Sequence, residues 1–131
     1  MVRAVPEEYL TPAGARAAEE MFGDGGPEVM ENNARRWETR VDESFAGIIT
    51  GFVINGMYSR DVLPTAIREL CAVAACAVLG RSEELAAHVR IALRSNEPEI
   101  VREVILQMAV YGGVPAALDG MRIFERVIAE G

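Results

Sequence analysis

The chain has 131 residues, of which half are hydrophobic, and a formal net charge of −7. This length suits one domain with a genuine core, so we expect residues 1–131 to form a single domain in which residues 1–10 are irregular. The acidic balance argues against a nucleic-acid partner, because nucleic-acid-binding surfaces are basic. All 13 basic residues are arginine, which excludes lysine Schiff-base chemistry and a Walker-type phosphate loop.

The sequence predicts a cytoplasmic protein without metal or cofactor. No apolar run is long enough to span a membrane, and the first residues lack the pattern of a signal peptide. Cys71 and Cys76 lie five residues apart on a predicted helix, and five residues turn a helix by about 140°. We therefore expect two buried, unbridged thiols in a reducing compartment. One histidine without an HExxH spacing provides no metal-ligand set.

The first half of the chain predicts two helical stretches. Thr11 and Pro12 favour a helix that runs to about Phe22, and the glycine-rich residues 23–27 form a connection. Residues 28–60 then predict a helix that breaks near 32–33 or at Gly47. An apolar stripe at helical spacing is expected to lie in the core: Trp37, Val41, Phe45, Ile48 and Phe52.

Two polar residues, Asn55 and Tyr58, lie near the end of this apolar run. They either line a pocket or make structural hydrogen bonds, and the second use is the more common one for such residues.

The stretch 64–92 predicts a helix, a stop at Gly80 and a second helix. Pro64 suits a first helical turn, Gly80 a left-handed helix end, and Ser82 a helix cap. One face of the first helix is expected to be deeply buried: Ile67, Leu70, Cys71, Ala74, Ala75 and Val78.

The second of these helices carries the only histidine, His88. A polar stripe lies beside the apolar stripe of this helix and comprises Arg81, Glu84, His88 and Ser95. Such a stripe is usually a solvated surface, but the very apolar preceding helix places His88 at the edge of a buried space. Glu69 stands out on that preceding helix, because an unpaired buried carboxylate is costly. An ion pair with an arginine is the structural alternative for it.

The last third of the chain predicts two more helices. Asn96-Glu97-Pro98 begins the first of them. Its apolar residues are Ile100, Val104, Met108 and Tyr111 on one face, widened by Val101, Ile105 and Ala109. Pro115 begins the last helix, whose apolar residues are Leu118, Met121, Ile123, Phe124 and Val127. No stretch has a strand pattern, so we expect an all-α protein of about six helices.

Two stretches resemble a known family. GRSEELAAHVRIAL at 80–93, followed by EIVREVILQMAVYGGVPAAL at 99–118, is similar to the carboxymuconolactone decarboxylase family, which includes the alkyl hydroperoxidase D proteins. The resemblance covers roughly residues 14–128. It implies an alkyl hydroperoxidase D-like helical bundle that assembles into a homo-oligomer, a trimer or hexamer. Arg81 and Glu84 occupy the positions of the peroxidase CxxC pair, so the resemblance implies the decarboxylase branch rather than a thiol peroxidase.

This branch implies cofactor-free loss of CO2 from a small carboxylated lactone or related enolisable acid. His88 is the expected acid, since a histidine's unperturbed pKa of about 6.5 allows proton donation near neutrality. Glu69 or Glu84 orients the imidazole or carries a second proton, and Arg81 binds the substrate carboxylate. The remaining expected substrate contacts are Tyr58 and Asn55.

The chain departs from the decarboxylase pattern at Ile54–Tyr58, and Glu69 stands where that branch has serine. Two alternatives therefore stay open. One is an isomerase or cyclase of a secondary-metabolite pathway on the same fold. The other is a non-catalytic oligomeric protein that binds a small ligand.

Overall fold

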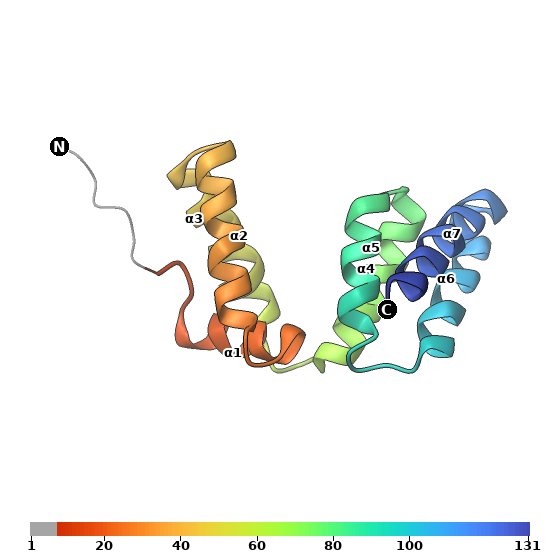
Figure 1. The fold of residues 1–131 in the computed structure, drawn as a ribbon, viewed down its shortest axis with the longest axis horizontal. Helices are drawn as coiled ribbons and strands as arrows, with labels where there is room; N and C mark the ends of the chain where they lie inside the picture. The colour runs from red at the N-terminus through yellow and green to blue at the C-terminus, as the bar shows by residue number, and fades with distance from the viewer. Residues whose placement is uncertain (1–7) are drawn as a thin grey trace. The chain divides into compact units, whose positions relative to one another are not determined.

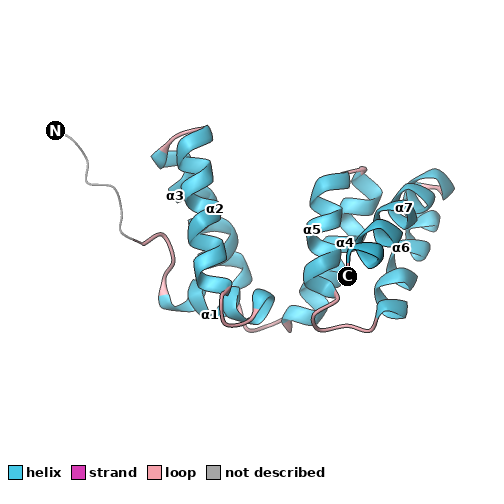
Figure 2. Cartoon of the chain, in the orientation of Figure 1, coloured by secondary structure: helices cyan, strands magenta, loops and turns pink. Residues whose placement is uncertain are grey.

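The computed structural model describes residues 8–131, and every regular element in that part of the chain is a helix (Figures 1 and 2). Seven α-helices and one π-helix occur there, which confirms the all-α class and adds to the expected six. Residues 8–10 have no regular structure, and the expectation for residues 1–7 lies outside the described residues.

The chain divides into two compact units, of which the first ends at Val62 and the second comprises Leu63–Gly131. The single domain expected for residues 1–131 stays a prediction.

The first unit consists of α1 (Pro12–Phe22), α2 (Gly26–Arg40), α3 (Glu43–Thr50) and the π-helix η1 (Gly51–Tyr58). Thr11 caps α1 as predicted, because its Oγ1 accepts a hydrogen bond from the Gly14 N–H at 3.0 Å. The predicted break near 32–33 or at Gly47 was wrong. The chain breaks after Arg40, and Asp42 starts α3 by accepting a hydrogen bond from the Phe45 N–H at 2.7 Å.

The expected aromatic and aliphatic stripe of the first unit does not form its core. Phe52 is 66% exposed, and Trp37, Val41 and Ile48 are exposed as well. The break after Arg40 interrupts the helical period on which the stripe was based. The buried side chains are mostly alanine and methionine, with one isoleucine: Ala17, Ala18, Met21, Met30, Ala34, Ala46 and Ile54.

The second unit consists of two helical hairpins, α4 (Thr65–Leu79) with α5 (Ser82–Ala92) and α6 (Pro98–Gly112) with α7 (Val114–Glu130). Gly80 ends α4 in the left-handed conformation predicted for it, with φ +69°. The start of α5 differs by one residue from the prediction: Arg81 occupies the cap position, and Ser82 is the first helical residue. Pro98 and Pro115 lie in the first turns of α6 and α7, as expected.

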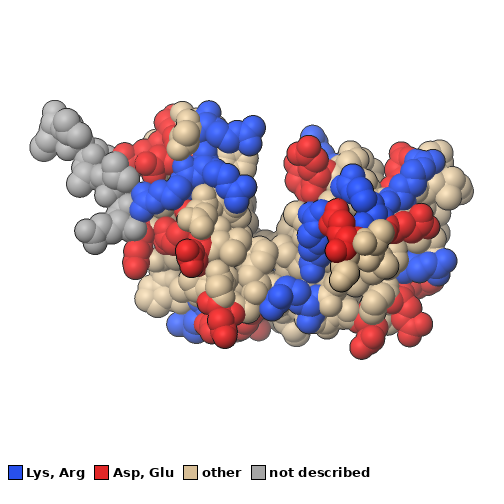
Figure 3. All heavy atoms as spheres, viewed as in Figure 1, with Lys and Arg blue, Asp and Glu red and all other residues tan. Residues whose placement is uncertain are grey.

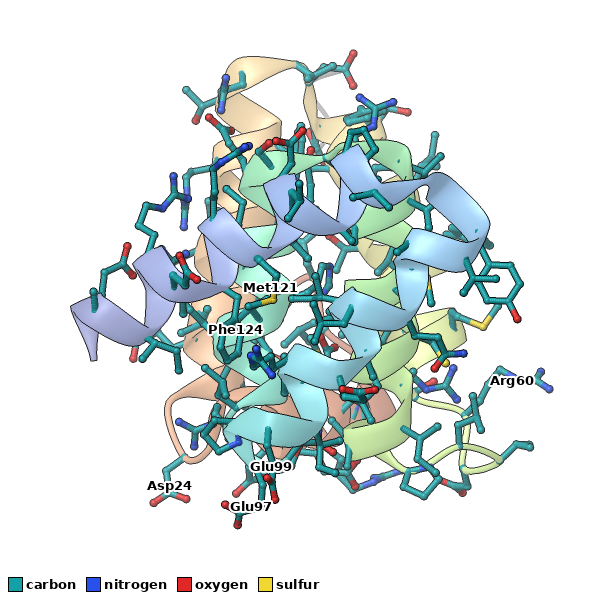
Figure 4. The ribbon with its side chains drawn as sticks, turned by 90° about the vertical axis from the view of Figure 1, so that its right-hand side faces the viewer. Asp24, Arg60, Glu97, Glu99, Met121 and Phe124 are labelled. Carbon is teal, nitrogen blue, oxygen red and sulfur yellow. The ribbon has the colours of Figure 1, made fainter. Side chains whose placement is uncertain are left out.

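The core of the second unit is drawn from all four helices, because α4 packs on α5, α6 and α7, and α7 also packs on α5 and α6. Its members are Val73, Ala77, Leu85, Ala86, Val89, Ala92, Val101, Ile105, Phe124 and Val127. Figure 4 shows Phe124 on the inner side of α7, with Met121 beside it. Arg90 also joins α5 to the end of α7 by a forked ion pair with Glu130.

The buried face of α4 is not the predicted one. Ile67, Cys71 and Val78 are exposed, whereas Glu69, Val73 and Ala77 are fully or almost fully buried. On α6, likewise, Val101 and Ile105 are buried while Ile100 and Tyr111 are exposed. These helices are apolar over most of their circumference, so periodicity alone did not determine which face turns inward.

Charge is interspersed on the surface. On the face drawn in Figure 3, arginine and acidic side chains lie among one another on each unit. Within residues 8–131, none of the helices combines the length and apolar character needed to cross a lipid bilayer.

Candidate functional site

The centre of the second unit holds a carboxylate–imidazole pair. The Oε2 atom of Glu69 lies 2.7 Å from Nδ1 of His88, a short hydrogen-bond distance. The Glu69 side chain is 0% exposed, whereas that of His88 is 25% exposed. The buried carboxylate therefore fixes one ring nitrogen, and the other, Nε2, is the atom through which His88 can meet a ligand.

The hairpin of α4 and α5 brings this pair together. The bend at Gly80 reverses the chain, and the Arg81 N–H donates to the Cys76 carbonyl at 3.0 Å to close the bend. Glu69 lies about three helical turns before Gly80 and His88 about two turns after it, and the two side chains face each other. Leu85 and Val89, on the adjacent face of α5, are buried in the core and fix the rotation of that helix.

The second carboxylate oxygen of Glu69 is not used by the contact with His88. Within the described residues its Oε1 atom is buried and has no hydrogen-bond partner. A buried acceptor without a donor is costly and uncommon in native proteins, and such atoms are typical of sites that bind a ligand or water. In the part of the chain that the structure describes, the ion-pair partner of Glu69 is His88, and the sequence-based alternative of an arginine from another subunit stays a prediction.

Arg81 and Glu84, which were predicted with the pair, lie on the same hairpin. Both are exposed, and Glu84 precedes His88 by one helical turn. Both also act electrostatically on the Cys76 thiol, as does Glu69. The hairpin thus gathers four of the six predicted site residues, together with a thiol that sequence reasoning did not include. Cys76 lies seven residues, or two helical turns, after Glu69 on α4, and this spacing is the sequence signal that could have identified it.

The two thiols differ from the expectation that both are buried, because Cys71 is exposed and Cys76 is partly buried. Burial raises the pKa of the Cys76 thiol, and the Glu84 and Glu69 carboxylates add to that effect. A raised thiol pKa leaves less thiolate, which is the reactive form.

We expect a disulfide reagent such as DTNB to react with the two thiols of the native protein in two phases at about pH 8. The fast phase belongs to Cys71 and the slow phase to Cys76. The Cys71→Ser variant should lose the fast phase and keep the slow one, and Cys76→Ser should do the reverse. Reaction of both thiols of the native wild-type protein with DTNB in a single phase would contradict this assignment.

The other two predicted site residues, Asn55 and Tyr58, belong to η1 in the first unit. Asn55 uses both ends of its amide there: Oδ1 accepts from the Thr11 N–H at 3.0 Å, and Nδ2 donates to the Tyr9 carbonyl at 3.0 Å. These bonds join η1 to the segment before α1. The structural use, which the sequence left open for Asn55, accounts for its contacts. Tyr58 is half-buried at the end of η1.

Across residues 8–131, no three side chains among His, Cys, Asp and Glu lie close enough to hold one metal ion.

These features define an all-helical protein with a candidate acid–base site on one hairpin. The model of the carboxymuconolactone decarboxylase family matches residues 47–126. The chain is also 30% identical to the 4-carboxymuconolactone decarboxylase of Acinetobacter baylyi (strain ATCC 33305 / BD413 / ADP1) over 90 residues, which are 68% of this chain and 67% of that relative. The chain belongs to the carboxymuconolactone decarboxylase family.

Proposed function

We propose that this protein is a cofactor-free lyase that removes CO2 from a small carboxylated lactone or a related enolisable acid. The observation that carries the proposal is the buried Glu69 carboxylate 2.7 Å from a partly exposed imidazole, that of His88. Family membership and the relative named as a 4-carboxymuconolactone decarboxylase support the same reaction class. We also propose that the helices adopt the alkyl hydroperoxidase D-like arrangement implied by the sequence.

In the proposed reaction the bond between the substrate carbon and its carboxylate breaks. The electron pair of that bond enters a dienolate conjugated with the lactone carbonyl, and CO2 leaves. His88 then donates a proton from Nε2 to carbon, while Glu69 stabilises the cationic ring through Nδ1 and holds its orientation. The proton balance closes when solvent or Glu84 returns a proton to the imidazole.

Arg81 is the proposed contact for the substrate carboxylate. A guanidinium binds a carboxylate through two parallel hydrogen bonds, and Arg81 stands at the first turn of the helix that carries His88. Glu84, exposed one turn before His88, is the proposed second proton carrier. The role of Asn55 in substrate binding is not proposed further, given its contacts with Thr11 and Tyr9.

The test is turnover of γ-carboxymuconolactone by the purified full-length protein, followed as CO2 release and as loss of the substrate's absorbance. Release of one CO2 per substrate consumed supports the proposal. Substrate consumption without CO2 indicates the second candidate below. Complete absence of consumption by the folded protein would overturn the assignment of this substrate.

The second candidate is an isomerase or cyclase that uses the same acid–base pair. The supporting observation is that Ile54–Tyr58, where the chain departs from the decarboxylase pattern, lies in a π-helix. π-Helical turns are rare and often occur at functional sites. An altered segment of this kind fits a changed substrate. The third alternative, a non-catalytic ligand-binding protein, predicts ligand binding without consumption in the same assay.

A thiol peroxidase remains the least favoured activity in our proposal. The exposed thiol, Cys71, and the thiol of raised pKa, Cys76, are both on α4, and the two family CxxC positions hold Arg81 and Glu84. We further propose a cytoplasmic location, because an exposed free thiol is typical of a reducing compartment.

We also propose that the protein forms a homo-oligomer, a trimer or hexamer. The supporting observation is an apolar patch at one end of the second unit, which we call the hairpin-end patch. It comprises Val78, Leu79, Val110, Tyr111 and Val114, all exposed, and Tyr111 is 71% exposed. The two hairpins meet there, since a Cβ atom at Gly112 would lie 3.3 Å from Val78 Cγ2. Apolar patches of this kind are typical of protein interfaces.

Size-exclusion chromatography with light scattering is expected to give three or six protomer masses for the wild-type protein. Leu79→Glu and Tyr111→Glu should each shift the mass toward one protomer, because they introduce an unpaired charge into the apolar patch. Glu99→Arg, at the exposed start of α6, is the matched control and should retain the wild-type mass. A monomeric wild-type protein would contradict the proposal.

A further inference from the structure

The side chain of Asn96 bridges the open end of the α4–α5 hairpin. Its Nδ2 atom donates to the Ala66 carbonyl at 3.1 Å and to the Ala92 carbonyl at 3.0 Å. An amide nitrogen has two hydrogens, so both are used. Asn96 is partly buried in the connection between α5 and α6. In Figure 4 the neighbouring Glu97 and Glu99 mark this end of the unit.

These contacts lie one helical turn from the carboxylate–imidazole pair. Ala66 precedes Glu69 by three residues on α4, and Ala92 follows His88 by four residues on α5. The opposite end of the hairpin is closed by the backbone bond from Arg81 to Cys76. The pair therefore lies between two points at which α4 and α5 are hydrogen-bonded to each other.

The side chain of Asn96 is not required to satisfy the end of α5. The Ala92 carbonyl already accepts a hydrogen bond from the Asn96 backbone N–H at 2.9 Å. The additional bond from Nδ2, paired with the bond to Ala66, instead links one helix to the other. Its geometric effect is to resist sliding of α4 along α5.

We propose that Asn96 is a positioning residue, whose carboxamide fixes the register that holds Glu69 Oε2 at 2.7 Å from His88 Nδ1. One residue of a helix rises about 1.5 Å. A slide of that size, directed across the contact, lengthens it to near the limit of hydrogen-bond distance, about 3.2 Å for N–H···O, and tilts it away from the favourable angle. The catalytic consequence of this inference rests on the proposed function, whereas the geometric part does not.

The chain contains one histidine, which makes nuclear magnetic resonance of ¹⁵N-labelled histidine a direct test. At a pH above the titration of the ring, the nitrogen shifts report which atom carries the proton. We expect one tautomer in the wild-type protein, with the proton on Nδ1 and facing Glu69. Asn96→Ala should give a mixture that includes the Nε2–H form, because the bond to Glu69 is weakened. Asn96→Asp, which keeps the shape but has no donor, should do the same.

A control variant that lowers stability by another route distinguishes a positioning role of Asn96 from a general loss of stability. Val127→Ala opens a void in the core of the second unit but removes no hydrogen-bonding group at Asn96, and it should lower the melting temperature while keeping the wild-type tautomer. If turnover is found, kcat of the Asn96 variants should fall by about 10- to 100-fold with a smaller change in KM, as expected for a misplaced catalytic group.

The outcomes distinguish this inference from the proposed function. Wild-type histidine spectra in both Asn96 variants, or the same spectral change in Val127→Ala, would overturn the positioning role even if the enzyme is active. Altered tautomers in the Asn96 variants alone, with no turnover by the wild-type protein, would support the positioning role and count against the lyase. Should Asn96→Asp fail to fold, Asn96→Ala decides the question.

Discussion

Replacement of His88 by alanine should lower kcat for CO2 release by about 10²- to 10⁴-fold, the usual contribution of a general acid. The reason is that the only imidazole in the chain is also the partly exposed member of the buried pair. Glu69→Gln should cause a smaller loss, because an amide oxygen can still accept the Nδ1 hydrogen bond but carries no charge to stabilise the cationic ring. Steady-state rates of the purified variants measure both effects.

The matched control is Glu83→Gln on the same helix. Glu83 is exposed and adjacent to Glu84, but the proposed mechanism gives it no role, so its variant should retain wild-type kcat. Circular dichroism and oligomer mass must be unchanged in all three variants for the comparison to be valid. A His88→Ala variant with wild-type turnover would exclude His88 as the proton donor, whatever the fate of the lyase assignment.

Gly26→Ala should destabilise the protein by about 3 kcal/mol, at the upper end of the usual cost of overpacking. A Cβ atom at Gly26 would lie 2.1 Å from the Ala18 carbonyl oxygen and 2.5 Å from the Ala18 carbonyl carbon. These neighbours are backbone atoms, so no side chain can rotate away, and α1 must move from α2. Urea unfolding followed by circular dichroism measures the change in the free energy of unfolding.

The neighbouring Gly25 provides the control for this prediction. A Cβ atom there would have no heavy atom within 4 Å, and its φ of −83° is accessible to alanine. Gly25→Ala should therefore change the free energy of unfolding by less than about 0.5 kcal/mol, the range of ordinary surface substitutions. Equal destabilisation by the two variants would show that the close approach of α1 and α2 is not what makes Gly26 necessary.

The sequence by itself determined the helical class, most helix ends in the second unit and two conspicuous candidate residues, Glu69 and His88. Proline, glycine and cap residues act through local backbone geometry, so Thr11, Gly80 and Pro98 predicted their helix ends without tertiary information. Glu69 was conspicuous because a lone carboxylate on an apolar helix is costly to bury. His88 was conspicuous as the only histidine on a polar stripe.

Only the tertiary structure decided which faces are buried and which polar groups meet. The helices α4 and α6 are apolar on most sides, so their periodicity fitted several orientations, and Cys71 and Ile100 were wrongly expected in the core. The pairing of Glu69 with His88 and the link through Asn96 join residues far apart in the chain. Such contacts depend on how helices pack, which local propensity does not specify.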